Sequence, residues 1–262
     1  MGKFTGYLFC SDLDGTLLNR DRRISAETEE AIRYFQENGG LFTMATGRWY
    51  DYLERYKPGF SPNSHVICLN GTVLCHRDTG EVLLSRPIRN KDSVVDDAKK
   101  IVTEDDEIWG MDVFVDGEDD GIGFSAEELV GTDFSELKKI VSEKEIFKLI
   151  FTYPDVGRHR VERMNKKYGD RYIFARSWSE GMEVVSHDAG KGAMMNVLRN
   201  MAEVPIHTTV AVGDYDNDIQ MVKYADIGYA VENAVDTLKE VADRVTVDRD
   251  SSPIAKIISE LD

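Results

Sequence analysis

Short apolar runs alternate with longer stretches whose apolar positions recur at helical spacing near the beginning of the sequence. The apolar run in residues 6–11 predicts a buried strand, and residues 41–47 predict a second one. The stretch between them, residues 24–40, predicts a helix that Ser25 can cap and that ends at Gly39. The order strand, helix, strand indicates a parallel sheet.

A hairpin and a further helix are expected next. Residues 65–76 contain two apolar segments separated by Asn70 and Gly71, a pair that favours a tight turn between antiparallel strands. A helical pattern covers residues 49–57 and stops at a segment rich in proline, glycine and serine.

The alternation of strands and helices returns near residue 191 and continues to the end of the sequence. We expect this part of the chain to complete the parallel sheet. Helical patterns cover residues 191–204, 217–225, 234–242 and 252–261, and strand patterns cover residues 207–214, 226–231 and 243–247.

The middle of the sequence has a different pattern, in which strands and helices do not alternate regularly. The sequence therefore predicts an α/β fold: a Rossmann-like parallel-sheet core, residues 1–82 and 188–262, interrupted by an inserted α+β domain, residues 83–187. Within the insert, helical patterns cover residues 90–106 and 134–144, and strand patterns cover residues 111–117, 146–153, 171–178 and 181–186.

Charge and composition narrow the possible partners. The net charge of −16 argues against a general role on nucleic acid or on an anionic membrane. No apolar run approaches the roughly 20 residues of a membrane span, and the first residues lack the apolar core of a signal peptide. The three cysteines form no CxxC motif, as is typical of a reducing compartment. We therefore expect a cytoplasmic protein, in which a metal or local positive charge would hold any anionic substrate.

The segment Asp12-Leu13-Asp14-Gly15-Thr16 directly follows the first predicted strand. In an extended backbone, residues two apart project to the same side, so Asp12 and Asp14 can face one point beyond the strand. Ligand sites of parallel α/β sheets lie at such strand ends. Two carboxylates this close ionise together only beside a cation, and a hard ion such as Mg²⁺ suits oxygen ligands.

Three further polar segments follow predicted strands or begin a helix. Each has an ordinary explanation when taken alone: Thr-Gly and Asp-Gly are common turn pairs, Lys-Gly carries little information, and the acidic segment could be a solvated loop. Together they would place a hydroxyl, an ammonium and several carboxylates at one edge of the sheet. They are Thr46-Gly47-Arg48, Lys191-Gly192 and Gly213-Asp214-Tyr215-Asp216-Asn217-Asp218.

The four segments, DLDGT, ATGR, Lys-Gly and GDYDND, resemble the four motifs of haloacid dehalogenase-like (HAD) phosphatases. The position of the insert between the second and third motifs, and the sequence LNGTVL, resemble the Cof-type branch, which carries a C2-type cap domain. The resemblance spans essentially the whole chain. It implies a phosphatase with a catalytic core and a cap that selects the substrate.

The resemblance also implies roles for individual residues. Asp12 would be the nucleophile, and Asp14 would be the general acid and then the base that activates water. Thr46 and Lys191 would hold phosphoryl oxygens. Mg²⁺ would be bound by Asp12, by the backbone carbonyl of Asp14, and by Asp214.

A second group of residues has less specific expected roles. Asn217 and Asp218 would complete the metal shell or orient Lys191. Gly47 and Arg48 belong to the phosphate-binding segment. Asn70 would contact substrate or phosphate, or would only form the hairpin turn. In the insert, Arg176, Ser177 and Glu183 are candidate substrate contacts, with ordinary packing or surface roles as the alternative.

The leading hypothesis is a Mg²⁺-dependent phosphatase that acts on small phosphorylated metabolites, such as sugar phosphates or phosphorylated cofactors, through an aspartyl-phosphate intermediate. A phosphomutase with the same chemistry is one alternative, and a non-catalytic sensor of phosphorylated metabolites is another. A dehalogenase is disfavoured, because Asp14 and the carboxylates of the fourth motif suit metal-dependent phosphoryl transfer.

Overall fold

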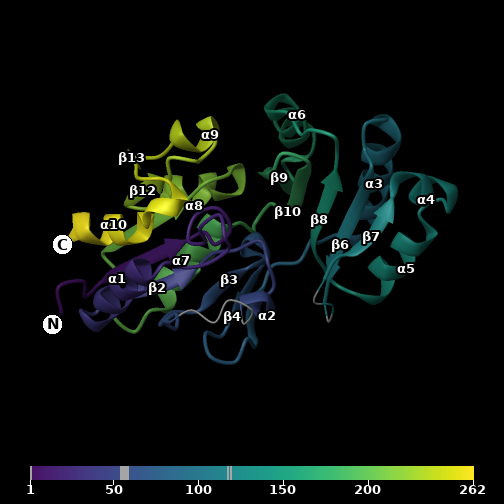
Figure 1. Cartoon of the computed structure of the whole chain (residues 1–262). Coiled ribbons are helices and arrows are strands. Elements are labelled where there is room, and N and C mark those ends of the chain that lie inside the picture. The colour runs from purple at the N-terminus through teal and green to yellow at the C-terminus, as the bar shows by residue number, and fades with distance from the viewer. Residues whose placement is uncertain (1, 54–58, 117, 119) are drawn as a thin grey trace. The chain divides into compact units, whose positions relative to one another are not determined.

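The described part of the chain divides into two compact units. The computed structural model describes residues 2–53, 59–116, 118 and 120–262 (Figure 1). Unit 1 comprises Met1–Ser85 and Gly190–Asp262, and unit 2 comprises Arg86–Ala189.

The first boundary lies after a strand that the sequence prediction did not include in the core. Strand β5 (Val82–Ser85) pairs antiparallel with β4 (Val73–Cys75), so unit 1 continues to Ser85 instead of ending at residue 82. The second boundary falls between Ala189 and Gly190, two residues after the expected one.

Unit 1 is built on a five-stranded parallel sheet, which confirms the predicted α/β fold with a parallel core. The strands lie in the order β13-β12-β11-β1-β2. Crossover helices connect them, as parallel pairing requires. The strands are β1 (Tyr7–Ser11), β2 (Leu41–Met44), β11 (Thr208–Gly213), β12 (Ile227–Ala230) and β13 (Arg244–Val245).

Both faces of this sheet are covered by helices. Along β1, Leu8 and Cys10 pack in one cluster with Leu198 of α7, whereas Phe9 contacts Phe35 of α1 on the other face. Strands buried on both faces are apolar at consecutive positions, and this is why their sequences lack an alternating pattern. The helices of unit 1 are α1 (Ala26–Glu37), α2 (Tyr50–Leu53), α7 (Lys191–Met201), α8 (Ile219–Tyr224), α9 (Asp236–Lys239) and α10 (Pro253–Leu261).

The predicted hairpin belongs to a second, three-stranded sheet of unit 1. Strand β3 (Val66–Cys68) pairs antiparallel with β4, and the 3-10 helix η1 (Leu69–Gly71) joins them. Helix α2 lies at the start of the helix predicted for residues 49–57, and residues 54–57 of that prediction lie outside the described residues.

In the residues that the structure describes, unit 2 contains a five-stranded antiparallel sheet in the order β7-β6-β8-β10-β9, together with four helices. Its apolar core includes residues of the sheet and of helix α3, for example Leu149 and Val94. The elements are α3 (Lys91–Glu104), β6 (Gly110–Val115), β7 (Ile122–Ser125), α4 (Ala126–Gly131), α5 (Ser135–Glu143), β8 (Ile146–Thr152), α6 (Arg158–Tyr168), β9 (Tyr172–Trp178) and β10 (Gly181–Ser186).

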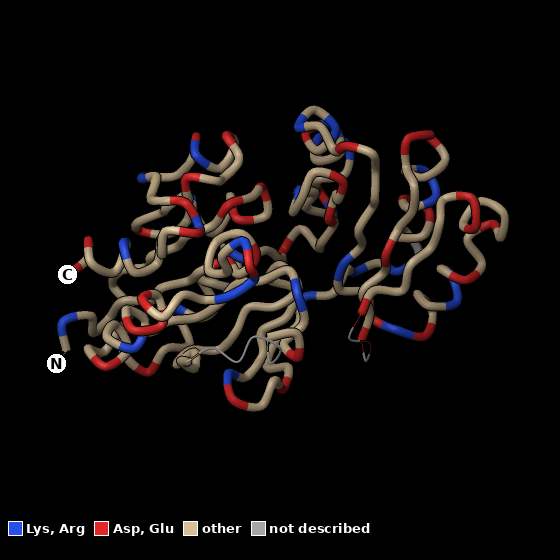
Figure 2. The backbone as a smooth tube through the Cα atoms, viewed as in Figure 1, with Lys and Arg blue, Asp and Glu red and all other residues tan. Residues whose placement is uncertain are grey.

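Charged residues are distributed along both units (Figure 2). The excess of acidic residues that gives the net charge of −16 is therefore not confined to one tail or loop. In the part of the chain that the structure describes, no helix is both long and apolar enough to cross a membrane.

Candidate active site

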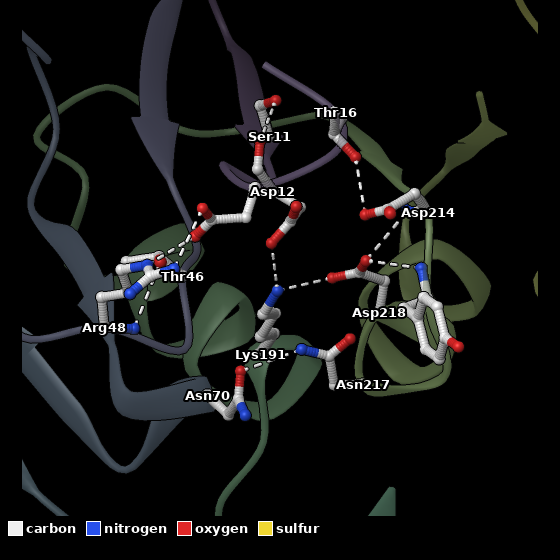
Figure 3. Close-up of polar contacts among 12 residues, drawn as sticks. Ser11, Asp12, Thr16, Thr46, Arg48, Asn70, Lys191, Asp214, Asn217 and Asp218 are labelled. Atoms are coloured by element: carbon white, nitrogen blue, oxygen red, sulfur yellow. Dashed lines mark hydrogen bonds and ion pairs between the residues drawn. The ribbon is translucent and has the colours of Figure 1, made fainter. Parts of the chain in front are cut away.

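Three neighbouring strands of the parallel sheet end in polar residues. Asp12 follows β1, Thr46 lies two residues after β2, and Asp214 follows β11. Because β11, β1 and β2 are adjacent and parallel, their carboxyl ends lie at the same edge of the sheet. Figure 3 shows these residues around Lys191, which begins helix α7.

The ammonium group of Lys191 lies between two carboxylates. Its Nζ donates to Asp12 Oδ1 and to Asp218 Oδ1, both at 2.6 Å (Figure 3). Lys191 is fully buried, and burial alone would lower its pKa. The charges of Asp12 and Asp218 outweigh that effect and raise the pKa of Lys191 above its usual value, so the lysine is held as a cation.

Asp218 also fixes the loop that carries Asp214. Its second oxygen, Oδ2, accepts from the backbone N–H groups of Asp214 at 3.0 Å and Tyr215 at 3.2 Å. The side chain is fully buried. Asp218 therefore orients both the Lys191 ammonium and the backbone at the end of β11.

Three carboxylates of this region are close enough to share one cation. One oxygen from each of Asp12, Asp214 and Asp218 lies within 4.8 Å of the others. Burial is the main cause that raises the pKa of Asp12 well above its usual range and that of Asp214 to about 7. Asp12 Oδ2 is buried and has no hydrogen-bond partner among the described residues. These three carboxylates are rich in oxygen, carry negative charge and are incompletely hydrogen-bonded. Such a group fits a hard divalent cation.

Gly15 and Thr16 shape the turn beside Asp214. Thr16 Oγ1 donates to Asp214 Oδ1 at 3.1 Å. Gly15 has φ +92°, and a Cβ at this position would lie 2.3 Å from Asp214 Oδ2, so the turn requires glycine. Asn233 Nδ2 donates to the Gly15 carbonyl at 2.9 Å. Sequence reasoning gave no role to Thr16, although it lies in the first motif, and no sequence signal marked Asn233.

Asp14 and Arg48 form an ion pair at the same edge of the sheet. The Arg48 Nε donates to Asp14 Oδ2 at 2.7 Å, and Nη2 donates to Asp14 Oδ1 at 3.2 Å. Both side chains are more than one third exposed, so solvent weakens the electrostatic attraction. The Arg48 guanidinium also lies 3.9 Å from the centre of the Tyr52 ring. Arg48, which the sequence assigned to phosphate, thus orients the Asp14 carboxylate in this structure.

Thr46, Gly47 and Asn70 form a second part of this edge. The backbone N–H of Asn70 donates to the Thr46 carbonyl at 2.9 Å. Asn70 is buried in a left-handed conformation with φ +57°, and its Oδ1 accepts from Asn217 Nδ2 at 3.1 Å. A Cβ at Gly47 would lie 3.1 Å from Asn70 Oδ1, so glycine allows this close approach. The hairpin turn therefore contacts both the second and the fourth sequence motifs.

Two of the three candidate residues of the insert have described polar contacts, and both contacts lie within unit 2. Arg176 Nη1 donates to the Val156 carbonyl at 3.3 Å. Glu183 forms a buried ion pair with Lys148 at 3.2 Å. The buried hydroxyl oxygen of Ser177 has no hydrogen-bond partner among the described residues.

Comparisons with known proteins show what this chain is similar to. A family model described as haloacid dehalogenase-like hydrolase matches residues 9–258. The chain is 24% identical to the 5-amino-6-(5-phospho-D-ribitylamino)uracil phosphatase YitU of Bacillus subtilis, over 97% of each chain.

Solved structures show the same fold. A haloacid dehalogenase-like hydrolase from B. subtilis superposes with a TM-score of 0.76 at 24% identity, covering 97% of this chain and 99% of the other. The HAD subclass IIB sugar phosphatase BT4131 has a TM-score of 0.74 at 21% identity, with 98% of both chains covered.

Proposed function

Since this chain belongs to the haloacid dehalogenase-like hydrolases, we propose that it is a Mg²⁺-dependent phosphatase of small phosphorylated metabolites. The observation that carries the proposal is the environment of Asp12. One oxygen of this buried carboxylate is held by the Lys191 ammonium at 2.6 Å, and the other has no hydrogen-bond partner among the described residues. A carboxylate oriented through one oxygen, with its second oxygen unbonded, is suited to act as a nucleophile.

In the first step, Asp12 attacks the phosphorus atom of the monoester. An acyl-phosphate bond forms on Asp12, the ester P–O bond breaks, and Asp14 gives its proton to the leaving oxygen. The Lys191 ammonium and the Thr46 hydroxyl stabilise the negative charge of the phosphoryl oxygens. Arg48 orients Asp14 through two hydrogen bonds, although this ion pair favours the ionised carboxylate over the protonated form that donates in this step.

In the second step, a water molecule attacks the phosphorus atom of the aspartyl phosphate. Asp14 takes the proton of that water, the bond to Asp12 breaks, and inorganic phosphate leaves. Division into two steps lowers a barrier that is among the highest known for biological hydrolysis.

The oxygen atoms at this edge of the sheet fit a magnesium ion. Asp12, Asp214 and the backbone carbonyl of Asp14 would hold it, with Asp218 and Asn217 supporting the loop around them. When bound, Mg²⁺ would neutralise part of the charge that otherwise repels the phosphate from the carboxylates. Lys191 alone leaves the group of three carboxylates with an excess of negative charge.

We further propose that unit 2 is a C2-type cap that selects the substrate. All the residues that we place in the chemistry belong to unit 1. The proposed substrate class is supported by the relatives described above, which include a phosphatase of a phosphorylated ribitylamino compound and a sugar phosphatase.

The proposal is tested by a panel of sugar phosphates and phosphorylated cofactor precursors, assayed for phosphate release with millimolar Mg²⁺ and after removal of metal by EDTA. We expect hydrolysis of one or more small monoesters that EDTA abolishes and Mg²⁺ restores. Full activity after exhaustive chelation would exclude the metal, and turnover that requires an added bisphosphate would identify a mutase instead. Absence of turnover on the whole panel, with retained binding, would favour a sensor.

A matched pair of variants tests Asp14. We expect Asp14→Asn to lower kcat by about 10²-fold or more, since general acid and base catalysis contributes on this scale. Mg²⁺ affinity should change little, because the carbonyl of residue 14 remains. Asp21→Asn is the control, because it changes an exposed carboxylate in the same segment between β1 and α1. A normal kcat at saturating Mg²⁺ in Asp14→Asn would remove Asp14 from the chemistry.

A further inference from the structure

Unit 1 contains an open cavity of about 390 Å³ that lies away from the site described above. Gly6, Leu41 and Ile206 line it, and these residues lie at or just before the amino ends of β1, β2 and β11. The proposed catalytic residues follow the carboxyl ends of the same strands. Because the strands are parallel, the cavity lies at the opposite edge of the sheet.

One side of the cavity is largely apolar. Leu198 and Met201 of α7, together with Val204, contribute to it, and Glu203 adds one exposed carboxylate to the lining. Met201 and Val204 are about half exposed, at 49% and 47%. Exposed apolar side chains in a concave surface gain free energy when an apolar group covers them.

The other side is basic. His65 and His76 lie opposite each other at the ends of β3 and β4, with ring centroids 5.1 Å apart, and Arg77 follows directly. The Nδ1 atom of His65 is buried without a hydrogen-bond partner among the described residues. In a chain of net charge −16, this is a local concentration of three basic side chains.

The charge of this wall is only partly balanced. Arg77 Nη1 donates to the Asn63 carbonyl at 2.6 Å, and Nε donates to Asp78 at 3.3 Å. The Asp78 side chain is 60% exposed, so solvent screens its charge. Burial, followed by the charges of His76 and Arg77, lowers the pKa of His65.

We propose that this cavity binds a small amphipathic anion, with its carboxylate, sulfonate or phosphate group at His65, His76 and Arg77 and its apolar body against Met201 and Val204. The volume lies within the range of about 300–1,000 Å³ that is usual for small-molecule sites. The two walls match the two parts of such a ligand.

A metal ion fits the cavity less well than an anion. Two imidazoles at this spacing could bind a transition metal, but stable sites usually have three or more protein ligands. In the described residues, the group of three possible ligands that meets this requirement is Asp12, Asp214 and Asp218, at the other edge of the sheet. The Arg77 guanidinium would also repel a cation.

The test uses naphthalene-2-sulfonate, a non-hydrolysable amphipathic anion, and follows the ring signals of the five histidines by NMR. The signals of His65 and His76, assigned with His65→Gln and His76→Gln, should shift during the titration. Those of His159 and His187, which belong to unit 2, should not. Naphthalene-2-methanol, which has the same rings without the charge, should bind roughly tenfold more weakly.

A charge-matched pair of variants locates the anion. Arg77→Gln should weaken sulfonate binding roughly tenfold, because a hydrogen bond to a charged group is lost. Arg20→Gln, which removes the same charge from an arginine that pairs with Asp250 outside the cavity, should leave the affinity unchanged. Thermal unfolding checks that both variants fold.

Three results would overturn the proposal. The first is the absence of shifts at His65 and His76 with millimolar sulfonate. The second is equal affinity of wild type and Arg77→Gln. The third is a response of the same two signals to ZnCl₂ alone, which would identify a metal site. Because none of these readouts uses phosphate release, they are independent of the proposed phosphatase activity.

Discussion

Each unit buries an aspartate beside a cation, and the two carboxylates have different surroundings. Asp97, on α3 of unit 2, is 4% exposed and accepts hydrogen bonds from Arg171 and from the Tyr172 hydroxyl, the latter at 3.0 Å. Asp12, in unit 1, is 5% exposed, and only its Oδ1 has a described partner, Lys191. Both bonds are accepted by Asp97 Oδ2, and Asp97 has no oxygen that is buried without a partner among the described residues, whereas Asp12 has one.

The balance of charge differs as well. Asp97 faces one guanidinium and one hydroxyl, while Lys191 is the cation that faces the group of Asp12, Asp214 and Asp218. Burying a surplus of negative charge costs stability unless a cation is added. Buried charge that is balanced by neighbouring residues is thus explained by the fold, and buried charge that is not balanced indicates a ligand.

The same substitution at the two aspartates gives the largest expected contrast. Asp12→Asn should lower phosphatase activity by about 10⁴-fold or more, because an amide is a poor nucleophile. Asp97→Asn should leave kcat within a few fold. Initial rates at saturating Mg²⁺, on a substrate identified by the panel, measure the difference.

For stability, the order of the two substitutions should be reversed, so that Asp97→Asn has the larger effect. Asp97→Asn should reduce the free energy of unfolding by about 1–3 kcal/mol, since it removes a charge that Arg171 requires. Asp12→Asn, measured without metal, should reduce it less or increase it, because the substitution removes a buried charge from a group with surplus negative charge. A stable Asp97→Asn protein together with an unstable, active Asp12→Asn protein would reverse the comparison.

The sequence predicted the elements of unit 1 better than those of unit 2. Strands such as β1 and β11 are apolar at consecutive positions because helices cover both faces, and this pattern is visible without a structure. Two elements of unit 2, β7 and α6, were not predicted from the sequence. Strand β7 contains Gly123 and is only partly buried, and α6 is rich in charged residues. Their stability comes from packing against the rest of the unit, which a local pattern does not contain.

Contacts between distant residues of the candidate site were also not predictable from local sequence patterns. The motifs identified Asp12, Lys191 and Asp214, because each follows or begins a regular element at one edge of the sheet. The contacts of Asn233 with Gly15 join residues distant in sequence and became visible only in the fold. The sequence also offered two roles for Asp218, and its contact with Lys191 is a matter of geometry.

The pH dependence of stability sharpens the comparison further. Burial raises the pKa of Asp214 from its ordinary 3.8 to about 7, so the folded, metal-free protein holds this proton more tightly than the unfolded chain does. The stabilisation that comes from this proton is complete below the pKa that Asp214 has in the unfolded chain, and it is lost as pH rises through about 7. Between about pH 5 and about pH 8, the free energy of unfolding without metal should fall by at most a few kcal/mol.

Mg²⁺ should oppose this loss, because it binds the ionised carboxylates and therefore stabilises the folded state more at high pH. Denaturant titrations at both pH values, with Mg²⁺ or with EDTA, measure the effect. Asp214→Asn, which cannot titrate at this position, should flatten the metal-free profile. A profile that is unchanged by this variant, or that rises with pH, would show that Asp214 is ionised in the metal-free fold.

The smallest expected effect on stability is the loss of a helix cap, and each unit offers one cap for comparison. Ser25 Oγ accepts from the Thr28 backbone N–H at 3.1 Å at the start of α1, and Ser125 Oγ accepts from the Glu128 N–H at 3.1 Å at the start of α4. Ser25 also shares a hydrogen bond with Ser252, at 2.8 Å, which joins α1 to the beginning of α10. Loss of a cap costs about 1 kcal/mol, and the additional bond should bring Ser25→Ala to about 2 kcal/mol.

Hydrogen exchange distinguishes the two variants by location. If the units unfold separately, Ser25→Ala should reduce the protection of α1 and leave that of α4 unchanged, and Ser125→Ala should do the reverse. Equal loss of protection in both helices from either variant would mean that the units unfold as one. In that case the proposed division of the chain into a chemical unit and a selecting unit would not extend to its stability, and the two aspartates would have to be compared within a single cooperative fold.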